Sequence, residues 1–404
     1  MKDNKLNNWK FHAKTPKVIT FVVTKDCQLA CKYCYLVNKN SKGRMSIETA
    51  KKAIDYILDN RTFFNEDSVF FDFIGGEPFL EIDLIDSICD YIKIQMYKKN
   101  HPWFDNYTFT FTTNGINYNN VKVQDFIAKN KKHVQITITI DGTKNKHDLN
   151  RIYKNSGKGS YEDVVRNIPL WVNQFPLEST KVTISHEDLP YICESVLHIF
   201  KLGIHRITMN CVFENVWKNG DDAIFEEQLM KLADAIIDND LYLDYSCNIF
   251  DDKIGKPSTE NKNWCGSGKM LAIDSEGKFY PCNRFLDFSL REKVPRTIGD
   301  IYSGIDTNKV RPFVLLNRET QSPKKCWTCE IASGCAWCQG ENYDSAKTDT
   351  IYERATAICL MHRARVRANN YFWNKLYWRI HQEGIDSTEV ISNIQAQITD
   401  KNNC

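Results

Sequence analysis

The sequence has no apolar run of membrane-spanning length, no excess of charge of one sign and no low-complexity tract. Its first 14 residues are polar, so no basic-then-apolar secretion signal opens the chain. Lysine and arginine number 53 and aspartate and glutamate 51, so the formal charge of +2 gives no reason to expect a nucleic acid partner. We therefore expect a cytoplasmic protein without membrane segments, whose 404 residues suffice for one large domain and a smaller one.

Cysteine, by contrast, is plentiful, since the chain has 15. Disulfides are improbable in a reducing compartment, so metal ligation is the economical explanation for most of them. Cys27, Cys31 and Cys34 fall within eight positions directly after an apolar segment. Three thiolates can hold three irons of a four-iron cluster and leave the fourth iron open for chemistry. Zinc is the alternative, although its usual signs, paired C-x2-C knuckles or a nearby histidine, do not accompany this run.

Two later segments extend this pattern. Residues 75–78 (GGEP) follow the apolar run 69–74, and residues 137–142 (TITIDG) precede Arg151. Together with C-x3-C-x2-C, in which Tyr33 stands before the last cysteine, they resemble the motifs of the radical SAM enzymes in their usual order. The resemblance implies that the three cysteines ligate a four-iron cluster that binds S-adenosylmethionine (SAM), and that they are the catalytic residues.

The resemblance also implies which residues hold SAM. Glu77 is expected to accept a hydrogen bond from its ammonium group, and Arg151 to pair with its carboxylate. The full set of expected cofactor-binding residues is Tyr33, Gly75, Gly76, Glu77, Pro78, Thr113, Asn114, Thr139, Asp141 and Arg151. Plainer roles stay open for some of them: Glu77 as the cap of a helix start, Arg151 as a surface salt bridge, and residues 112–115 as a turn.

In the first half, short β-rich runs alternate with helical patterns. The strand candidates are residues 18–23, 68–74, 107–113, 134–141, 181–185 and 206–213. Six strand–helix units predict parallel pairing with right-handed crossovers. This agrees with the α/β fold of the family, a partial (β/α)6 TIM-type barrel. The cysteine run and the GGEP segment follow the first two strands, so both should lie at the same rim.

The domain boundaries follow from composition and from the placing of these motifs. A helix near residues 223–237 is expected to close the barrel, and a polar stretch follows it. A helix over residues 362–382 carries an aromatic stripe that is expected to pack into the core. The predicted parts are an N-terminal arm (1–17), the barrel (18–240), a linker or bridging region (241–264), a cysteine-rich domain (265–361), and a C-terminal helix and tail (362–404).

Seven cysteines of the second half form another pattern. They are Cys265, Cys282, Cys326, Cys329, Cys335, Cys338 and Cys359. Their order resembles the SPASM extension of radical SAM enzymes, although the central run ends C-x2-C where the family usually has C-x3-C. The resemblance implies an outer four-iron cluster on Cys326, Cys329, Cys335 and Cys359. It implies an inner one on Cys265, Cys282 and Cys338. A zinc ribbon over residues 326–338 is the alternative.

The inner set leaves one iron without an obvious protein ligand. Residues 255–264 contain no cysteine, and Cys247 is the nearest candidate. An open iron could bind a substrate thiolate, because soft thiolates suit iron–sulfur clusters. Cys89, Cys193 and Cys211 are expected to pack as small hydrophobes.

The family chemistry is reductive cleavage of SAM to a 5′-deoxyadenosyl radical that removes a substrate hydrogen. We expect an oxidoreductase with three four-iron clusters that crosslinks a ribosomally made peptide, with a cysteine thioether as first choice. Formylglycine formation in a sulfatase is the runner-up, ranked lower because Asn283 stands where those relatives have an aspartate. Carbon–carbon or ether crosslinking is a further alternative. A non-catalytic iron–sulfur electron carrier is the alternative from another class.

The expected partners are a cysteine-containing peptide or protein and a flavodoxin or ferredoxin as reductant. Many relatives carry an N-terminal leader-recognition domain, whereas 26 residues precede Cys27 here. Leader binding is therefore expected to use the linker, the tail or a separate protein.

Overall fold

The computed structural model describes residues 16–41, 43–258, 260–261, 265–382 and 392. Most of the predicted N-terminal arm lies outside these residues, as do Cys404 and all but one of the residues after Gln382. Within the described part, no helix is both long and apolar enough to span a membrane.

A curved parallel sheet forms the first half. Its strands are β1 (Lys17–Thr24), β2 (Val69–Gly75), β3 (Tyr107–Thr113), β4 (Val134–Ile138), β5 (Ser179–Ile184), β6 (Arg206–Cys211) and β7 (Ser246–Cys247). Parallel pairing joins β1 through β4 in order and β5 through β7 in order, and a bridge between Thr139 and Lys181 connects the two groups. The expected α/β fold with six parallel strands is confirmed, and β7 adds a seventh.

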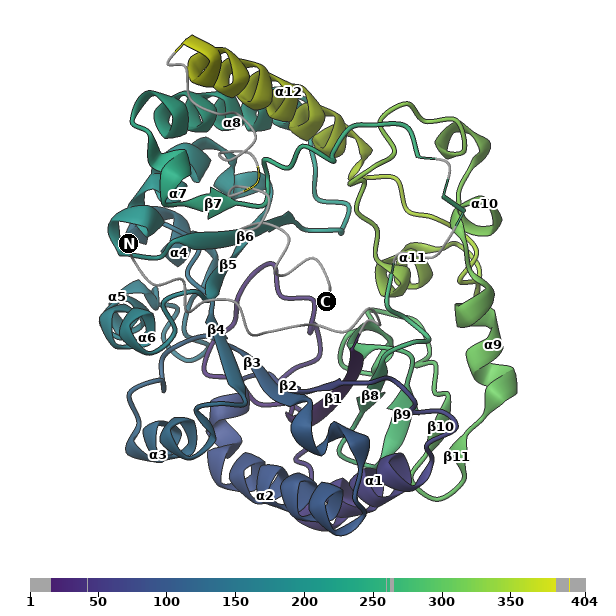
Figure 1. Cartoon of the computed structure of the whole chain (residues 1–404). Coiled ribbons are helices and arrows are strands. Elements are labelled where there is room, and N and C mark those ends of the chain that lie inside the picture. Colours follow the sequence, from purple (N-terminus) through teal and green to yellow (C-terminus); the bar gives the residue numbers. More distant parts are fainter. Residues whose placement is uncertain (1–15, 42, 259, 262–264, 383–391, 393–404) are drawn as a thin grey trace.

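Helices cover the outer face of this sheet (Figure 1). They are α1 (Ile47–Asp59), α2 (Ile82–Lys98), α3 (Val121–Asn130), α4 (Lys144–Asn150), α5 (Tyr161–Val165), α6 (Ile168–Gln174), α7 (Ile192–Lys201) and α8 (Asp221–Asp238). The strands alternate to match. On β3, Tyr107, Phe109 and Phe111 are buried toward the helices, while the threonines between them face the inside of the barrel and keep some exposure.

The described residues of the predicted linker are folded onto the barrel. β7 lies within them, and Tyr242, Ile249, Phe250 and Ile254 are buried. A two-residue strand in a polar stretch has no periodicity to reveal it, which is why composition alone suggested a linker.

The second half continues the same sheet from the other edge of β1. The strands β8 (Leu271–Ile273), β9 (Lys278–Tyr280), β10 (Gly299–Asp300) and β11 (Gly304–Ile305) follow one another, with β8 parallel to β1 and the rest antiparallel. The helices of this half are α9 (Thr307–Leu315), α10 (Arg318–Gln321), α11 (Gln339–Ser345) and α12 (Cys359–Gln382). In Figure 1 this green half stands across from β4 to β6.

The long helix α12 packs along α8 of the barrel (Figure 1). It begins three residues earlier than predicted. On this helix Trp373 and Ile380 are buried, as expected for residues that pack into the core, whereas Tyr377 is exposed. The buried face instead includes the small residues Ala364 and Ala368, which allow close approach of the two helices.

Candidate functional site

The loop after β1 carries the three adjacent cysteines. Cys27 is buried, and Cys31 and Cys34 are half-buried. The backbone of the loop is fixed by side chains, because the Cys27 N–H donates to Asn40 Oδ1 at 2.9 Å and Lys154 Nζ donates to Asp26 Oδ1 at 2.6 Å. Burial raises the pKa of the Cys27 thiol to about 11, so a cation is needed to hold a thiolate there at neutral pH.

The GGEP segment is clamped against this loop by backbone contacts. The Gly76 N–H donates to Thr24 O at 3.0 Å and the Glu77 N–H to Asp26 O at 2.8 Å. A Cβ atom at Gly76 would stand 2.2 Å from Asp26 O and 2.8 Å from Cys27 Cβ. Only glycine permits this approach, so the two motifs are positioned together as their shared rim predicted.

Glu77 is almost wholly buried and anchors the end of β3. Its Oε1 accepts from the Thr113 hydroxyl at 2.6 Å and from the Phe79 N–H at 3.1 Å, and its Oε2 accepts from the Asn114 N–H at 2.8 Å. The carboxylate thus caps the short helix η1 (Pro78–Glu81), the plainer role foreseen for it. Burial raises its pKa, and Oε2, with one protein donor, has room for a second.

Tyr33, Asp141 and Arg151 form a buried chain beside the cysteines. The Tyr33 hydroxyl donates to Asp141 Oδ2, and Arg151 Nη1 donates to Tyr33 Oη at 2.9 Å. Asp141 Oδ1 accepts the Thr183 N–H at 3.0 Å, so Asp141 is engaged within the protein. Thr139, the residue that follows β4, is buried and bridges to Lys181 of β5.

The Nε of Arg151 is buried and has no hydrogen-bond partner among the described residues. Desolvation of a guanidinium donor is costly unless an acceptor reaches it. Arg151 is therefore no surface salt bridge. An unsatisfied cation next to three thiols fits a cofactor that brings its own carboxylate.

Six of the later cysteines influence one another in two sets of three. Burial and the mutual repulsion of Cys265, Cys282 and Cys338 raise the pKa of the Cys282 thiol. Likewise, burial and the charges of Cys326 and Cys359 raise the pKa of Cys335.

This division bears on the zinc alternatives. The charges that act on Cys335 are those of Cys326 and Cys359, whereas Cys338 acts on Cys265 and Cys282, and this does not favour one site that uses both Cys335 and Cys338. Among the described residues no three potential ligands converge as they would around a single ion. The cysteines of a four-iron cluster each bind a different iron and need no such point of convergence.

Cys247, the nearest candidate for a fourth inner ligand, lies in β7. Its Sγ donates to Met209 Sδ at 3.2 Å, and burial raises its pKa to about 12. Cys89 packs in the core as expected.

Arg284 links the two cysteine regions and was not foreseen from the sequence. Its Nε donates to Cys338 Sγ at 3.4 Å and its Nη2 to Glu214 at 2.8 Å, while the guanidinium lies 4.7 Å from the Tyr35 ring centre. Tyr35 Oη in turn accepts from Asn283 Nδ2 at 2.9 Å. In the sequence, only its position two residues after Cys282 indicated that Arg284 could lie near the cysteines.

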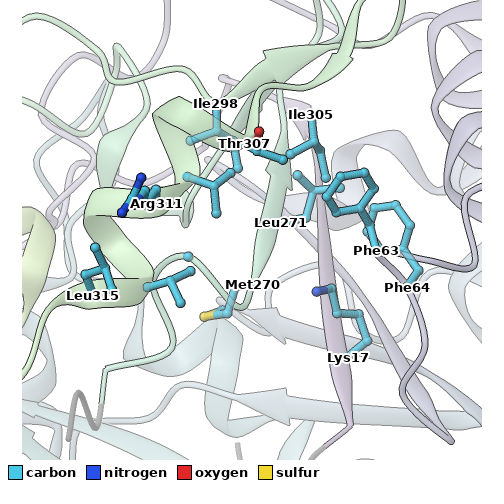
Figure 2. A pocket seen from close by; sticks show the side chains of 13 residues that line it. Lys17, Phe63, Phe64, Met270, Leu271, Ile298, Ile305, Thr307, Arg311 and Leu315 are labelled. Carbon is cyan, nitrogen blue, oxygen red and sulfur yellow. The ribbon is translucent and has the colours of Figure 1, made fainter.

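A mainly apolar pocket of about 250 Å³ lies at the opposite end of β1 (Figure 2). Lys17, the first residue of β1, lines it together with Phe63, Met270 and Leu315. The cysteine loop lies at the other end of the same strand, because Cys27 comes three residues after Thr24, where β1 ends. The pocket is therefore separate from the cysteine loop.

The family model of the radical SAM superfamily matches residues 21–189. This stretch contains the cysteine loop, the GGEP segment and the Tyr33–Asp141–Arg151 chain. Residues 21–189 therefore form a radical SAM domain.

Three curated relatives are similar to the chain. An uncharacterised protein of Methanocaldococcus jannaschii is 28% identical over 269 residues, 66% of this chain and 84% of that protein. The serine-type anaerobic sulfatase-maturating enzyme of Bacteroides thetaiotaomicron is 22% identical over 341 residues, 76% and 78% of the two chains. The antilisterial bacteriocin subtilosin biosynthesis protein AlbA of Bacillus subtilis is 24% identical over 348 residues, 82% and 69%.

Two solved structures share the fold. Native anSMEcpe with bound AdoMet aligns with a TM-score of 0.66 at 20% identity, covering 90% of this chain and 98% of that one. SuiB of Streptococcus suis bound to precursor peptide SuiA aligns with a TM-score of 0.57 at 14% identity, covering 85% and 75%.

Proposed function

We propose that this enzyme matures a ribosomally made peptide by joining a cysteine sulfur to a carbon atom of another residue. The proposal is supported by the mutual influence of the three thiols Cys265, Cys282 and Cys338, while Cys247 is engaged with Met209. An iron held beside Cys265, Cys282 and Cys338 would keep a position for the substrate thiolate. The names of AlbA, a bacteriocin biosynthesis protein, and of SuiB with its precursor peptide support a peptide substrate.

In this proposal Cys27, Cys31 and Cys34 hold the first four-iron cluster, and Glu77 Oε2 and Arg151 Nε bind the amino and carboxylate groups of SAM. When bound, cluster and SAM supply the radical that removes a hydrogen atom from an unactivated carbon. The protein's own residues hold the cofactors in position and exclude water from them. The clamp between Gly76 and Asp26 fixes the spacing of the two motifs, and Tyr33 and Asp141 hold Arg151 in place.

Thioether formation must balance in atoms and electrons. The substrate carbon loses one hydrogen atom to 5′-deoxyadenosine, and the thiol loses its proton. When the sulfur–carbon bond forms, one electron leaves the substrate. An auxiliary cluster is suited to take this electron, and a flavodoxin or ferredoxin is proposed to supply the one that cleaves SAM. Three clusters and a peptide partner are thus parts of the same proposal.

Formylglycine formation is the competing activity, because a sulfatase-maturating enzyme is among the relatives. The side chain of Asn283 argues against this activity. Its Nδ2 donates to Tyr35, and an amide cannot accept the proton that this oxidation releases.

The test uses the full chain, reconstituted without oxygen and given dithionite and SAM. Formation of 5′-deoxyadenosine is expected, and a mere electron carrier would produce none. Small cysteine-containing peptides encoded by neighbouring reading frames are then added. A product that has lost two hydrogen atoms and no longer reacts with iodoacetamide supports the thioether. A hydrazide-reactive aldehyde would instead establish formylglycine and overturn the proposal.

A further inference from the structure

Lys181 is a charged residue in the middle of a barrel strand. Its neighbours on β5, Thr180 and Val182, are fully buried toward the helices, so alternation turns Lys181 to the inside of the barrel. The charges that act on it confirm this direction, since the largest come from Asp141, Arg151 and Cys34. Lys181 therefore faces the same space as the first cysteine loop.

No group of the described residues neutralises this ammonium. No side-chain hydrogen bond or ion pair within 4.0 Å joins the Lys181 ammonium to another described residue, although both kinds of contact are frequent elsewhere in the barrel. Asp141, the nearest influential carboxylate, is held by Tyr33 and Thr183.

The other carboxylate of the barrel interior is also occupied. Asp72 on β2 accepts the Thr20 hydroxyl at 3.2 Å and the Thr110 hydroxyl at 3.0 Å, one on each oxygen. These threonines flank Asp72 in register on β1 and β3. Asp72 thus satisfies its hydrogen bonds locally, and although the charge of Lys181 acts on it, the two side chains form no ion pair within 4.0 Å.

Two further cations surround the position. Arg151 and Arg284 both act on Lys181, and burial lowers the pKa of its ammonium. A partly buried charge is costly unless an opposite charge reaches it directly. Since Asp141 and Asp72 act on Lys181 without forming an ion pair with it, the arrangement fits an anionic ligand that enters the barrel.

We propose that Lys181 binds a carboxylate of the peptide substrate inside the barrel, so that the enzyme selects peptides with an acidic group near the reacting residue. The inference rests on the proposed function for the peptide and adds its chemistry. The carboxylate of SAM is assigned to Arg151, whose Nε is free to receive it. An aspartate or glutamate side chain and a free C-terminus are the two possible sources of the carboxylate.

The test measures retention of synthetic peptide pools on the reconstituted full chain with SAM bound. One pool contains N-acetylated, C-amidated octapeptides with one cysteine and one aspartate or glutamate. A second has asparagine or glutamine in place of the acid, and a third has the amides with a free C-terminus. Variants Lys181→Met and Lys181→Arg are compared with Lys122→Met, which removes an exposed lysine of α3.

We expect the wild type to retain one carboxylate-bearing pool at least fivefold better than the amide pool. The preference should vanish in Lys181→Met, return in Lys181→Arg and persist in Lys122→Met. Which pool is retained identifies the source of the carboxylate. Equal retention of all pools by the wild type, or an unchanged preference in Lys181→Met, overturns the inference.

A second readout separates this inference from the proposed function. Formation of 5′-deoxyadenosine without peptide, and the KM for SAM in that reaction, should match the wild type in both Lys181 variants. A KM for SAM that rises in Lys181→Met alone would assign the lysine to SAM and overturn the substrate role. Absence of 5′-deoxyadenosine in the wild type would refute the proposed function itself.

Discussion

The two cysteine regions of this enzyme treat their thiols differently. In the barrel, the Leu29 N–H donates to Cys27 Sγ at 3.3 Å, and no arginine side chain among the described residues bonds a sulfur of that loop. In the second half an arginine serves each group, since Arg284 donates to Cys338 and Arg354 to Cys335, the latter at 3.1 Å.

Hydrogen bonds from cations stabilise the more negative, reduced form of a cluster and raise its reduction potential. In the proposed function, the barrel loop, which has no such hydrogen bond from an arginine, would hold the more strongly reducing cluster. The clusters proposed for the second half would then receive the electron that leaves the substrate.

The largest difference between the two regions is expected when each set of thiols is removed in turn. Replacing Cys27, Cys31 and Cys34 with alanine should abolish 5′-deoxyadenosine formation, because the site for SAM is lost. Replacing Cys265, Cys282 and Cys338 should leave this reaction and eliminate the peptide product. Iron and sulfide content and chromatography of the nucleoside check both. SAM cleavage by the first triple variant would contradict the assignment.

Next in size is the clamp between the motifs. In Gly76→Ala the new methyl group would collide with the Asp26 backbone, so the GGEP segment must move away from the cysteine loop. A displacement of about 1 Å is expected to lower SAM cleavage about 100-fold.

Gly157→Ala is the matched control for this clamp. No atom lies within 4 Å of its new methyl group, although its φ of +67° adds strain of about 1 kcal/mol. It should lower stability and leave SAM cleavage intact. Equal activities of the two variants would show that the contact at Gly76 is dispensable.

The arginines provide a finer test of the comparison. Loss of a charge-assisted hydrogen bond in Arg284→Gln or Arg354→Gln removes about 1.5 kcal/mol from the reduced state. This corresponds to a fall of about 60 mV in the potential of the respective auxiliary cluster. Redox titration followed by electron paramagnetic resonance measures it. Arg284→Lys keeps the charge and should recover part of the shift, and the first cluster should keep its potential in Arg354→Gln.

The smallest expected effect is a pH dependence from Asp72. Burial raises its pKa from 3.8 to about 6. Between pH 3.8 and about pH 6 the unfolded chain has already released this proton, whereas the folded chain still holds it. The free energy of unfolding therefore falls as the pH rises through this range, and the loss is complete above about pH 6. Asp72→Asn should therefore stabilise the fold more at pH 7.5 than at pH 4.

Because water reaches part of this site, the difference should be about 1 kcal/mol. Thermal unfolding at the two pH values measures it. Asp83→Asn, on the exposed face of α2, serves as control and should change little at either pH. A gain for Asp72→Asn that is the same at both pH values would show that burial does not shift this carboxyl.

Much of the fold was predictable from the sequence, because the strands of a parallel barrel are strong apolar runs with regular spacing. Local motifs were equally clear where consecutive residues make the contact, as in the cysteine loop and GGEP. The division of the later cysteines was predicted from a resemblance. What escaped prediction depends on long-range packing. The strand β7 is too short to show a period, and Arg284 gains its meaning from partners far away in the chain, such as Glu214 and Tyr35.

The pairing of β8 with β1 sets a limit on dissection of this enzyme. The strand that ends at the reactive loop is paired on one side by β2 and on the other by residues 271–273, from beyond the barrel. A fragment that stops before residue 265 would leave the backbone groups along that side of β1 unpaired. Such an open strand edge can pair with another molecule and cause association. The halves should accordingly be swapped or truncated only together, and a shortened gene product is expected to precipitate rather than to retain partial activity.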